Sequence, residues 1–365
     1  MRLVLAFSIF VENRYILNNP KIEFGELNQG SFQQLLRSEY SAAKKVIIVD
    51  ENTHDHCLEY VLTSFEELAD AEVMLLPAGE ENKVLEVCSQ VWEALTQYRI
   101  GRKDLIINLG GGVVTDMGGF IASVFKRGVH FIHIPTSLLG MVDAAIGGKT
   151  GIDLGPFKNQ LGVFASPKAI YVDPVFLGTL PEKELWNGFA EILKCGLIAD
   201  SALWKEASNI RSKEELKDLA LIRKAALLKQ SIVDMDPYES NERKLLNFGH
   251  TVGHALEGFF LSIEETIGHG HAVAIGMLIE SRLSFKVGNL SEQQLHEIEE
   301  TLGIYPMIQL DNEDQIDTII GLMHNDKKNE RNEIRGIRLD SIGEGTVDVT
   351  YDPEQLKEIM KSCFL

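Results

Sequence analysis

Short apolar runs alternate with helical patterns over about the first 175 residues of the chain. Helical periods at 80–98 and 115–125 lie between these runs. The runs are rich in β-branched residues and lie at 46–49, 73–76, 105–108, 131–134 and 170–172. Continuous apolar strands separated by helices are typical of a parallel sheet covered on both faces. The pattern predicts an α/β domain with a mostly parallel sheet, whose ligands bind beyond the carboxyl ends of the strands.

From Pro181 onward the pattern changes to long helical periods. We expect helices at 181–198, 214–234, 245–260, 271–287, 291–302 and 314–324, and strands at 334–339 and 346–350. A chain of 365 residues is too long for one ordinary core. We therefore predict an α/β domain of residues 1–177 and a mainly α-helical domain of residues 178–365, with the active site in the cleft between them.

Charge and cysteine content exclude several functional classes. The chain has 35 Lys and Arg against 54 Asp and Glu, a formal net charge of −19, which argues against nucleic-acid and anionic-membrane partners. Its four cysteines form no CxxC pair and are typical of reduced thiols in a cytoplasmic protein. Residues 1–15 are apolar but too short to span a membrane and lack a small-residue cleavage site. We expect a first strand there.

Residues 239–277 hold four of the ten histidines in an apolar surround. His250 and His254 are spaced i, i+4, which places both rings on one helix face. They either bind a metal or relay protons, or they are core histidines bonded to carbonyls. His269 and His271 favour a metal. Glu191 lies in another apolar helix and needs a partner, which is either Lys194 at i+3 or a metal ion.

A glycine-rich segment at 108–119 follows a predicted strand and opens a helix. It suits either a bound pyrophosphate or a plain glycine turn, and its spacing is not GxGxxG. Asp50, at the end of an earlier strand, suits a ribose hydroxyl. Lys149 and Lys158 lie among glycines and small residues, where they indicate either anion binding or solvated surface lysines.

Nine motifs in order resemble the 3-dehydroquinate synthases of the sugar-phosphate cyclase superfamily. The resemblance runs from about Asp50 to Lys328. The motifs are PAGEENK at 77–83, GGGVVTDMGGF at 110–120, KRG at 126–128, PTSLLGMVDAAIGGKTGID at 135–153, KNQLGVF at 158–164, GFAEILK at 188–194, ESNERKLLNFGHTVGHALE at 239–257, HGHAVAIGM at 269–277 and DKK at 326–328.

The resemblance implies an N-terminal NAD-binding domain, a helical metal- and substrate-binding domain, and a homodimer. It implies a divalent metal, zinc or cobalt, on Glu191, His250 and His269. NAD would bind Asp50, Asn52, Glu80, Lys83, Gly111, Gly112, Asp116, Thr136, Ser137, Phe176, Thr179 and Glu184. The catalytic residues would be His254, Glu239, Lys149, Lys194, Arg243 and Asn247. Substrate contacts would be Asp143, Lys158, Asn159, Lys327 or Lys328, and Arg127 from the neighbouring subunit.

The implied reaction is the conversion of 3-deoxy-D-arabino-heptulosonate 7-phosphate to 3-dehydroquinate and phosphate, in the shikimate pathway of aromatic amino acid biosynthesis. NAD would transiently oxidise the substrate while the metal polarises its oxygens. Phosphate would then leave, the hydride would return, and an aldol-type step would close the ring. Lysines and Arg243 would concentrate positive charge on the anionic substrate. His254 and Glu239 would transfer protons.

Two departures from the family pattern leave rival substrates open. The chain has His269-Gly-His271 where HGE is usual, and Asp143-Ala-Ala where Asp-Ser-Ser is usual. The HGH form is similar to that of cyclases acting on sedoheptulose 7-phosphate. A metal- and NAD-dependent polyol dehydrogenase shares the architecture, but a neutral polyol needs no lysine cluster.

Overall fold

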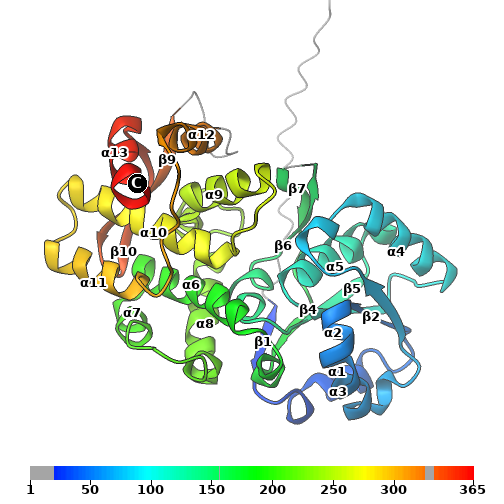
Figure 1. The fold of residues 1–365 in the computed structure, drawn as a ribbon. Helices are drawn as coiled ribbons and strands as arrows, with labels where there is room; N and C mark the ends of the chain where they lie inside the picture. Colours follow the sequence, from blue (N-terminus) through cyan, green and yellow to red (C-terminus); the bar gives the residue numbers. More distant parts are fainter. Residues whose placement is uncertain (1–19, 156, 325–332) are drawn as a thin grey trace, which may run out of the picture.

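A six-stranded parallel sheet organises the first part of the chain (Figure 1). The computed structural model describes residues 20–155, 157–324 and 333–365. The strand order is β1–β8–β5–β4–β2–β3. The strands are β1 (Lys21–Phe24), β2 (Lys45–Asp50), β3 (Glu72–Leu76), β4 (Leu105–Gly110), β5 (His130–Pro135) and β8 (Ala169–Val172). The predicted parallel sheet is confirmed, and β1 is an addition to it. The strand expected within residues 1–15 lies outside the described residues.

Helices cover both faces of this sheet, which explains why its strands are apolar without alternation. On β2, Val46 and Ile48 pack into a cluster with residues of α4 and α5, while Ile47 and Val49 pack on the opposite side. The helices are α1 (Phe32–Ser38), α2 (Glu51–Thr53), α3 (Glu59–Ser64), α4 (Leu85–Gln97) and α5 (Gly112–Val124).

The helix predicted for residues 80–98 is wrong at its start. A 3₁₀ turn at Glu80–Asn82 comes first, and Lys83 then leaves helical geometry with φ −79° and ψ 57°. The Lys83 carbonyl accepts a hydrogen bond from the Asp153 backbone N–H at 2.8 Å, so this stretch is held by another segment rather than by a helix. The apolar period of α4 begins only at Leu85.

The strand order reverses between β2 and β4. From β2 the chain passes to β3 on one side, and then crosses back to β4 on the other. Connections leave the carboxyl ends of such neighbouring strands in opposite directions, which opens a crevice where ligands of doubly wound sheets bind. Asp50 ends β2 and Gly110 ends β4, so the glycine-rich segment lies at this crevice.

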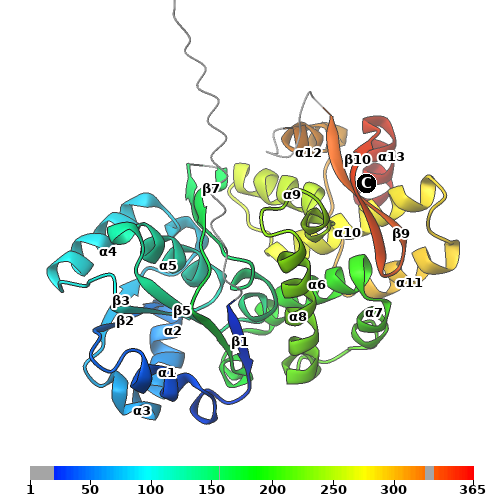
Figure 2. The same ribbon diagram turned by 180° about the vertical axis from the view of Figure 1, so that it is seen from behind.

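The second part of the chain is mainly helical, as predicted (Figure 2). It comprises α6 (Glu182–Ala199), α7 (Ser201–Ala207), α8 (Leu219–Met235), α9 (His250–Ser262), α10 (His269–Lys286), α11 (Glu292–Leu302), α12 (Glu313–His324), β9 (Ile334–Ser341), β10 (Glu344–Tyr351) and α13 (Pro353–Phe364). One hydrophobic cluster includes residues of both parts, from Leu27 to Leu339, so the division into domains at residue 177 stays a prediction. Within the described ranges, no helix is long and apolar enough to cross a bilayer.

The helix predicted for residues 245–260 begins later than expected. Residues Glu242–Asn247 form a 3₁₀ turn, and Gly249 takes a left-handed φ of 77° before α9 begins at His250. A Cβ on Gly276 of α10 would lie 2.0 Å from the Gly249 carbonyl oxygen, so the two segments cross almost backbone to backbone. This break puts His250 in the first turn of its helix.

A two-stranded antiparallel hairpin stands between the sheet and the helical part (Figures 1 and 2). It consists of β6 (Lys149–Leu154) and β7 (Phe157–Phe164), and the sequence pattern did not predict it. Gly151 and Gly162 face each other across the two strands, where added Cβ atoms would collide with backbone. The hairpin carries both lysines that the sequence singled out, Lys149 and Lys158.

Candidate active site

Three helices bring Glu191, His250 and His269 together. Glu191 lies in the middle of α6, and the two histidines are the first residues of α9 and α10. The Nε2 atoms of His250 and His269 lie 3.7 and 3.6 Å from Glu191 Oε1. One ligand atom from each of the three residues lies within 4.8 Å of the other two. A Glu with two His and an open side is a donor set of catalytic zinc sites.

The other nitrogen of each ring is already bonded in the way that metal sites require. His250 Nδ1 lies 3.2 Å from the Phe248 carbonyl, and His269 Nδ1 lies 3.4 Å from Glu257 Oε2. A carbonyl or carboxylate oxygen can only accept, so both Nδ1 atoms carry a proton, and both Nε2 atoms are left to coordinate a metal. Both Nε2 atoms face Glu191 Oε1. The three residues therefore fit a divalent metal ion.

The Glu191 carboxylate also fits a metal ligand. Its side chain is 1% exposed, Lys194 forms an ion pair with Oε2, and the Nε2 atoms of both histidines approach Oε1. Burial lowers the pKa of His269, but Glu191 and Glu257 outweigh it and raise that pKa to about 10. The pocket thus stabilises positive charge between its carboxylates, and a divalent metal supplies that charge.

A second group of possible ligands shares His269. His254, Glu257 and His269 also have ligand atoms within 4.8 Å of one another. Here Glu257 Oε1 bonds the Lys158 ammonium at 2.9 Å. His254 is exposed at this edge, with its ring centroid 5.1 Å from that of His250. The first group, which is more deeply buried, is the better metal site.

His271 points to a different neighbour. Its Nε2 lies 2.5 Å from the Pro306 carbonyl oxygen, and its ring centroid lies 6.2 Å from that of Tyr305. Among the described residues, it belongs to neither ligand group. The unusual histidine of the HGH segment is therefore engaged in packing α10 against the segment before α12.

Two buried lysines hold Asp143. Lys229 Nζ donates to Asp143 Oδ1 at 2.5 Å, and Lys194 Nζ lies 4.0 Å from the same oxygen. Burial raises the pKa of Asp143, but the two ammonium groups outweigh it and hold that pKa well below its usual range. Lys229 was missed in the sequence. The available signal was its place in an apolar stretch of α8, where a lysine is buried only with a partner.

Lys149, Arg243 and Asn247 lie around Glu239 and the glycine pair before Lys149. Lys149 pairs with the Glu239 carboxylate, and Asn247 Nδ2 donates to Glu239 Oε1 at 2.8 Å. Burial lowers the pKa of Lys149, and Glu239 only partly restores it. The Arg243 guanidinium donates to the Gly147 carbonyl at 2.9 Å. Lys149 and Asn247 therefore contact Glu239, and Arg243 contacts the glycine pair that precedes Lys149.

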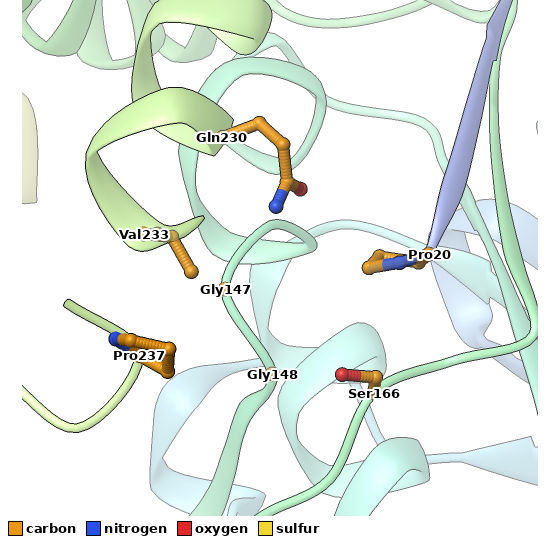
Figure 3. A pocket seen from close by; sticks show the side chains of 7 residues that line it. All are labelled: Pro20, Gly147, Gly148, Ser166, Gln230, Val233 and Pro237. Atoms are coloured by element: carbon orange, nitrogen blue, oxygen red, sulfur yellow. The ribbon is translucent and has the colours of Figure 1, made fainter. Parts of the chain in front are cut away.

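A small pocket lies behind the glycine pair that precedes Lys149 (Figure 3). Its volume is about 10 Å³, enough for roughly one water molecule. It is lined by Pro20, Gly147, Gly148, Ser166, Gln230, Val233 and Pro237. None of the cationic residues described above lines it, and a space of this size holds no sugar phosphate.

The residues expected to bind NAD gather beyond the carboxyl ends of the parallel strands. Asp50 and Asn52 follow β2, Glu80 and Lys83 follow β3, and the rest, except Glu184 in α6, follow β4, β5 and β8. The Lys83 ammonium, deeply buried, bonds Asp116 and Asn159 at 2.7 Å each. This contact joins the hairpin to the expected cofactor side of the site.

The start of α5 fits a phosphate group. No side chain within the described ranges caps this helix, whose N-cap is Gly111. A Cβ on Gly111 would lie 3.2 Å from Ser137 Oγ, and one on Gly112 would lie 3.3 Å from Ala144 Cβ, so both positions are tight for a side chain. Bare backbone N–H groups at a helix start, with the positive end of the helix dipole, bind anions. Asp50 differs, because its carboxylate caps α2 by accepting from Thr53 N–H at 2.8 Å.

Arg127 lies away from this cluster. It lies three residues beyond the end of α5, whose 13 residues span about 20 Å, whereas the glycines that fit the NAD pyrophosphate are at the start of this helix. Its side chain is exposed. Two further candidates, Lys327 and Lys328, lie outside the described residues.

Comparisons with known proteins agree over most of the chain. Family models match at residues 73–187, described as 3-dehydroquinate synthase N-terminal, and 188–329, described as 3-dehydroquinate synthase C-terminal. The 3-dehydroquinate synthase of Clostridium acetobutylicum is 36% identical over 358 residues, covering 96% of each chain. That of Parabacteroides distasonis is 37% identical over 320 residues, covering 86% of this chain and 90% of the relative.

Solved structures share the fold at lower identity. A 2-deoxy-scyllo-inosose synthase complexed with carbaglucose-6-phosphate, NAD+ and Co2+ has a TM-score of 0.80 at 24% identity. The 2-epi-5-epi-valiolone synthase of Streptomyces hygroscopicus, with NAD+ and Zn2+ bound, has a TM-score of 0.77 at 24% identity. Each comparison covers 94% of this chain and 96% of the other.

Proposed function

The chain belongs to the 3-dehydroquinate synthase family, and from that premise we propose that it converts 3-deoxy-D-arabino-heptulosonate 7-phosphate to 3-dehydroquinate and phosphate. It is then a carbon–oxygen lyase of the shikimate pathway, which serves aromatic amino acid biosynthesis. The observation that carries the proposal is the buried Glu191–His250–His269 group with a cluster of lysines beside it. The ligands for a metal ion and the cationic side chains for an anionic substrate therefore lie next to each other.

The metal ligands are Glu191, His250 and His269, and the ion is zinc or cobalt. NAD+ with Zn2+ or Co2+ in the two related structures supports this assignment. When bound, the metal supplies a Lewis acid for substrate hydroxyl oxygens, and NAD accepts and returns a hydride. Glu191 would be the most buried of the three ligands, and His254 lies exposed with its ring beside that of His250.

The chain's own residues bind the substrate and move its protons. Lys149, Lys158, Lys194 and Arg243 attract its carboxylate and phosphate, because charge-assisted contacts to anions are strong in a partly buried site. His254, exposed beside the metal ligands, and Glu239 transfer protons. Asp143, Asn159 and Asn247 orient hydroxyl groups as hydrogen-bond partners, with Lys327 or Lys328 as a further contact.

NAD would be held at the crevice between the ends of β2 and β4. The bare start of α5 at Gly111 and Gly112 would bind its pyrophosphate, together with Thr136 and Ser137. Asp50 and Asn52 hold a ribose, and Glu80, Lys83 and Asp116 form the adjacent wall. Phe176, Thr179 and Glu184 complete the site from the side of α6.

The active unit is a cytoplasmic homodimer. Arg127 is exposed and lies beyond the end of α5, outside the cluster of cationic residues at its own site, and we assign it to the substrate phosphate of the neighbouring subunit. In a C2 dimer each subunit would then contribute its Arg127 to the partner's site. The four cysteines are free thiols, as suits a reducing compartment.

One assay tests the proposal. With zinc or cobalt and catalytic NAD, the purified protein should release phosphate from the heptulosonate phosphate without net formation of NADH. Accumulation of NADH from glycerol without phosphate release would instead indicate a polyol dehydrogenase. A parallel assay with sedoheptulose 7-phosphate separates the cyclase substrates, and faster turnover of that sugar would overturn the substrate assignment.

A further inference from the structure

Glu257 is a buried carboxylate whose two oxygens contact two different residues of the site. It lies on α9, its side chain is 7% exposed, and both of its oxygens are engaged. Oε1 accepts from Lys158 Nζ at 2.9 Å, and Oε2 lies 3.4 Å from His269 Nδ1. A buried charge is costly unless it is paired, and here each oxygen has a cationic or N–H partner.

The two partners come from different parts of the fold. His269 begins α10 in the helical part, whereas Lys158 lies on β7 of the hairpin next to Asn159, which bonds Lys83. A metal-binding histidine usually donates its second ring N–H to a carboxylate or carbonyl, which sets the ring's tautomer and direction. Glu257 meets that description for His269.

The contacts argue against Glu257 as a metal ligand in its own right. A metal between His254, Glu257 and His269 would use an exposed histidine, whereas the group of Glu191, His250 and His269 has two buried members. It would also leave the buried Glu191 carboxylate, which the Nε2 atoms of His250 and His269 approach, without a metal.

We propose that Glu257 is a positioning residue that orients His269 and Lys158 together. It keeps His269 Nε2 directed at the metal and holds the Lys158 ammonium where the substrate anion arrives. The part of this inference that concerns Lys158 and the substrate rests on the proposed function. The part that concerns His269 and the metal, called the metal half below, does not.

Zinc titration against a competing chelator tests the metal half without any turnover. Replacing Glu257 by Ala should raise the zinc Kd by about 10–100-fold, the usual effect of losing such a partner. Glu257→Gln should retain most of the affinity, since the amide oxygen still accepts from Nδ1–H. Glu265→Gln removes the same charge from an exposed side chain of the segment that leads into α10 and should match the parent.

Each alternative result is decisive. An alanine variant with the parent's zinc Kd would overturn the positioning role. Equal losses in the Gln and Ala variants would assign the carboxylate directly to the metal, which also overturns it. The Gln variant keeps the side chain's shape, so it remains informative if the Ala variant fails to fold, and the absorption spectrum of bound Co2+ reports any change in ligand geometry.

Substrate kinetics test the Lys158 half. Lys158→Met should raise KM for the sugar phosphate and leave the zinc Kd unchanged. If Glu257 acts on substrate through Lys158, adding Lys158→Met to Glu257→Gln should raise KM less than it does in the parent. Independent effects would overturn this half. A protein with no cyclase activity but with the expected zinc Kd series would refute the proposed function alone.

Discussion

Replacement of Lys194 by Met removes a buried positive charge from between two carboxylates. The Lys194 side chain is 2% exposed, pairs with Glu191, and lies 4.0 Å from Asp143 Oδ1. Methionine retains the apolar stem, so the main change is electrostatic. Removing one partner of a buried ion pair leaves an uncompensated charge and costs about 3–5 kcal/mol. Without added metal, we expect the free energy of unfolding to fall by that amount.

Zinc should recover much of this loss. A dication beside Glu191 replaces the missing positive charge, and the Lys194 ammonium no longer repels it. We therefore expect a lower zinc Kd in the variant than in the parent. A ligand present at 100 times its Kd adds about 2.7 kcal/mol to the free energy of unfolding. At one fixed zinc concentration the stability gap between variant and parent should therefore narrow.

The measurement is urea unfolding followed by circular dichroism, once with EDTA and once with zinc. Lys183→Met is the matched control, because Lys183 lies on the same helix with its side chain 82% exposed. It should remain within about 0.5 kcal/mol of the parent. The reasoning fails if Lys194→Met is as stable as this control in EDTA, or if zinc leaves the gap unchanged.

Three further predictions concern single residues. His269→Ala should lose bound zinc and His271→Ala should retain it, as measured by metal content after dialysis; the reverse would reassign the ligands. Because its pKa is lowered, the Asp143 carboxylate should stabilise the fold above about pH 4, and this stabilisation should be lost as the pH falls further. In the Asp143→Asn variant, the free energy of unfolding should therefore fall less steeply with decreasing pH below about pH 4. An unchanged dependence on pH in that range would contradict this prediction. Arg127→Ala and His269→Ala subunits, each inactive alone, should regain activity when unfolded and refolded together, and no recovery would count against Arg127 acting across a dimer.

Much of the fold could be predicted because its strands are buried on both faces. The β-branched runs of β2, β4 and β5 are continuous and could be found locally. The β6–β7 hairpin could not, because its strands contain glycines that only make sense where Gly151 and Gly162 meet. The late start of α9 was missed for the same reason, since it depends on the crossing of Gly249 with Gly276.

The sequence predicted only part of the site, because the separation of two residues along the chain does not determine their distance in the folded protein. The i, i+4 rule pairs His250 with His254, whereas the structure pairs His250 with His269 and Glu191. Only the resemblance to a family indicated that grouping beforehand. Glu257 escaped notice because it follows His254 by one helical turn and looks like an ordinary surface glutamate. Its lysine partner is 99 residues away in the chain.

The acidity of the chain and the anionic substrate are compatible because the site's cations are already neutralised. Each of five lysines at the site forms an ion pair with a carboxylate of the same chain. The pairs are Lys83–Asp116, Lys149–Glu239, Lys158–Glu257, Lys194–Glu191 and Lys229–Asp143. An incoming ligand must therefore compete with these carboxylates. A neutral polyol gains too little from an ammonium to displace one, whereas a phosphate or carboxylate can replace it on equal terms. The pairing thus favours a substrate with several negative charges, and Lys149, the most exposed of the five lysines, is the one expected to exchange its partner first.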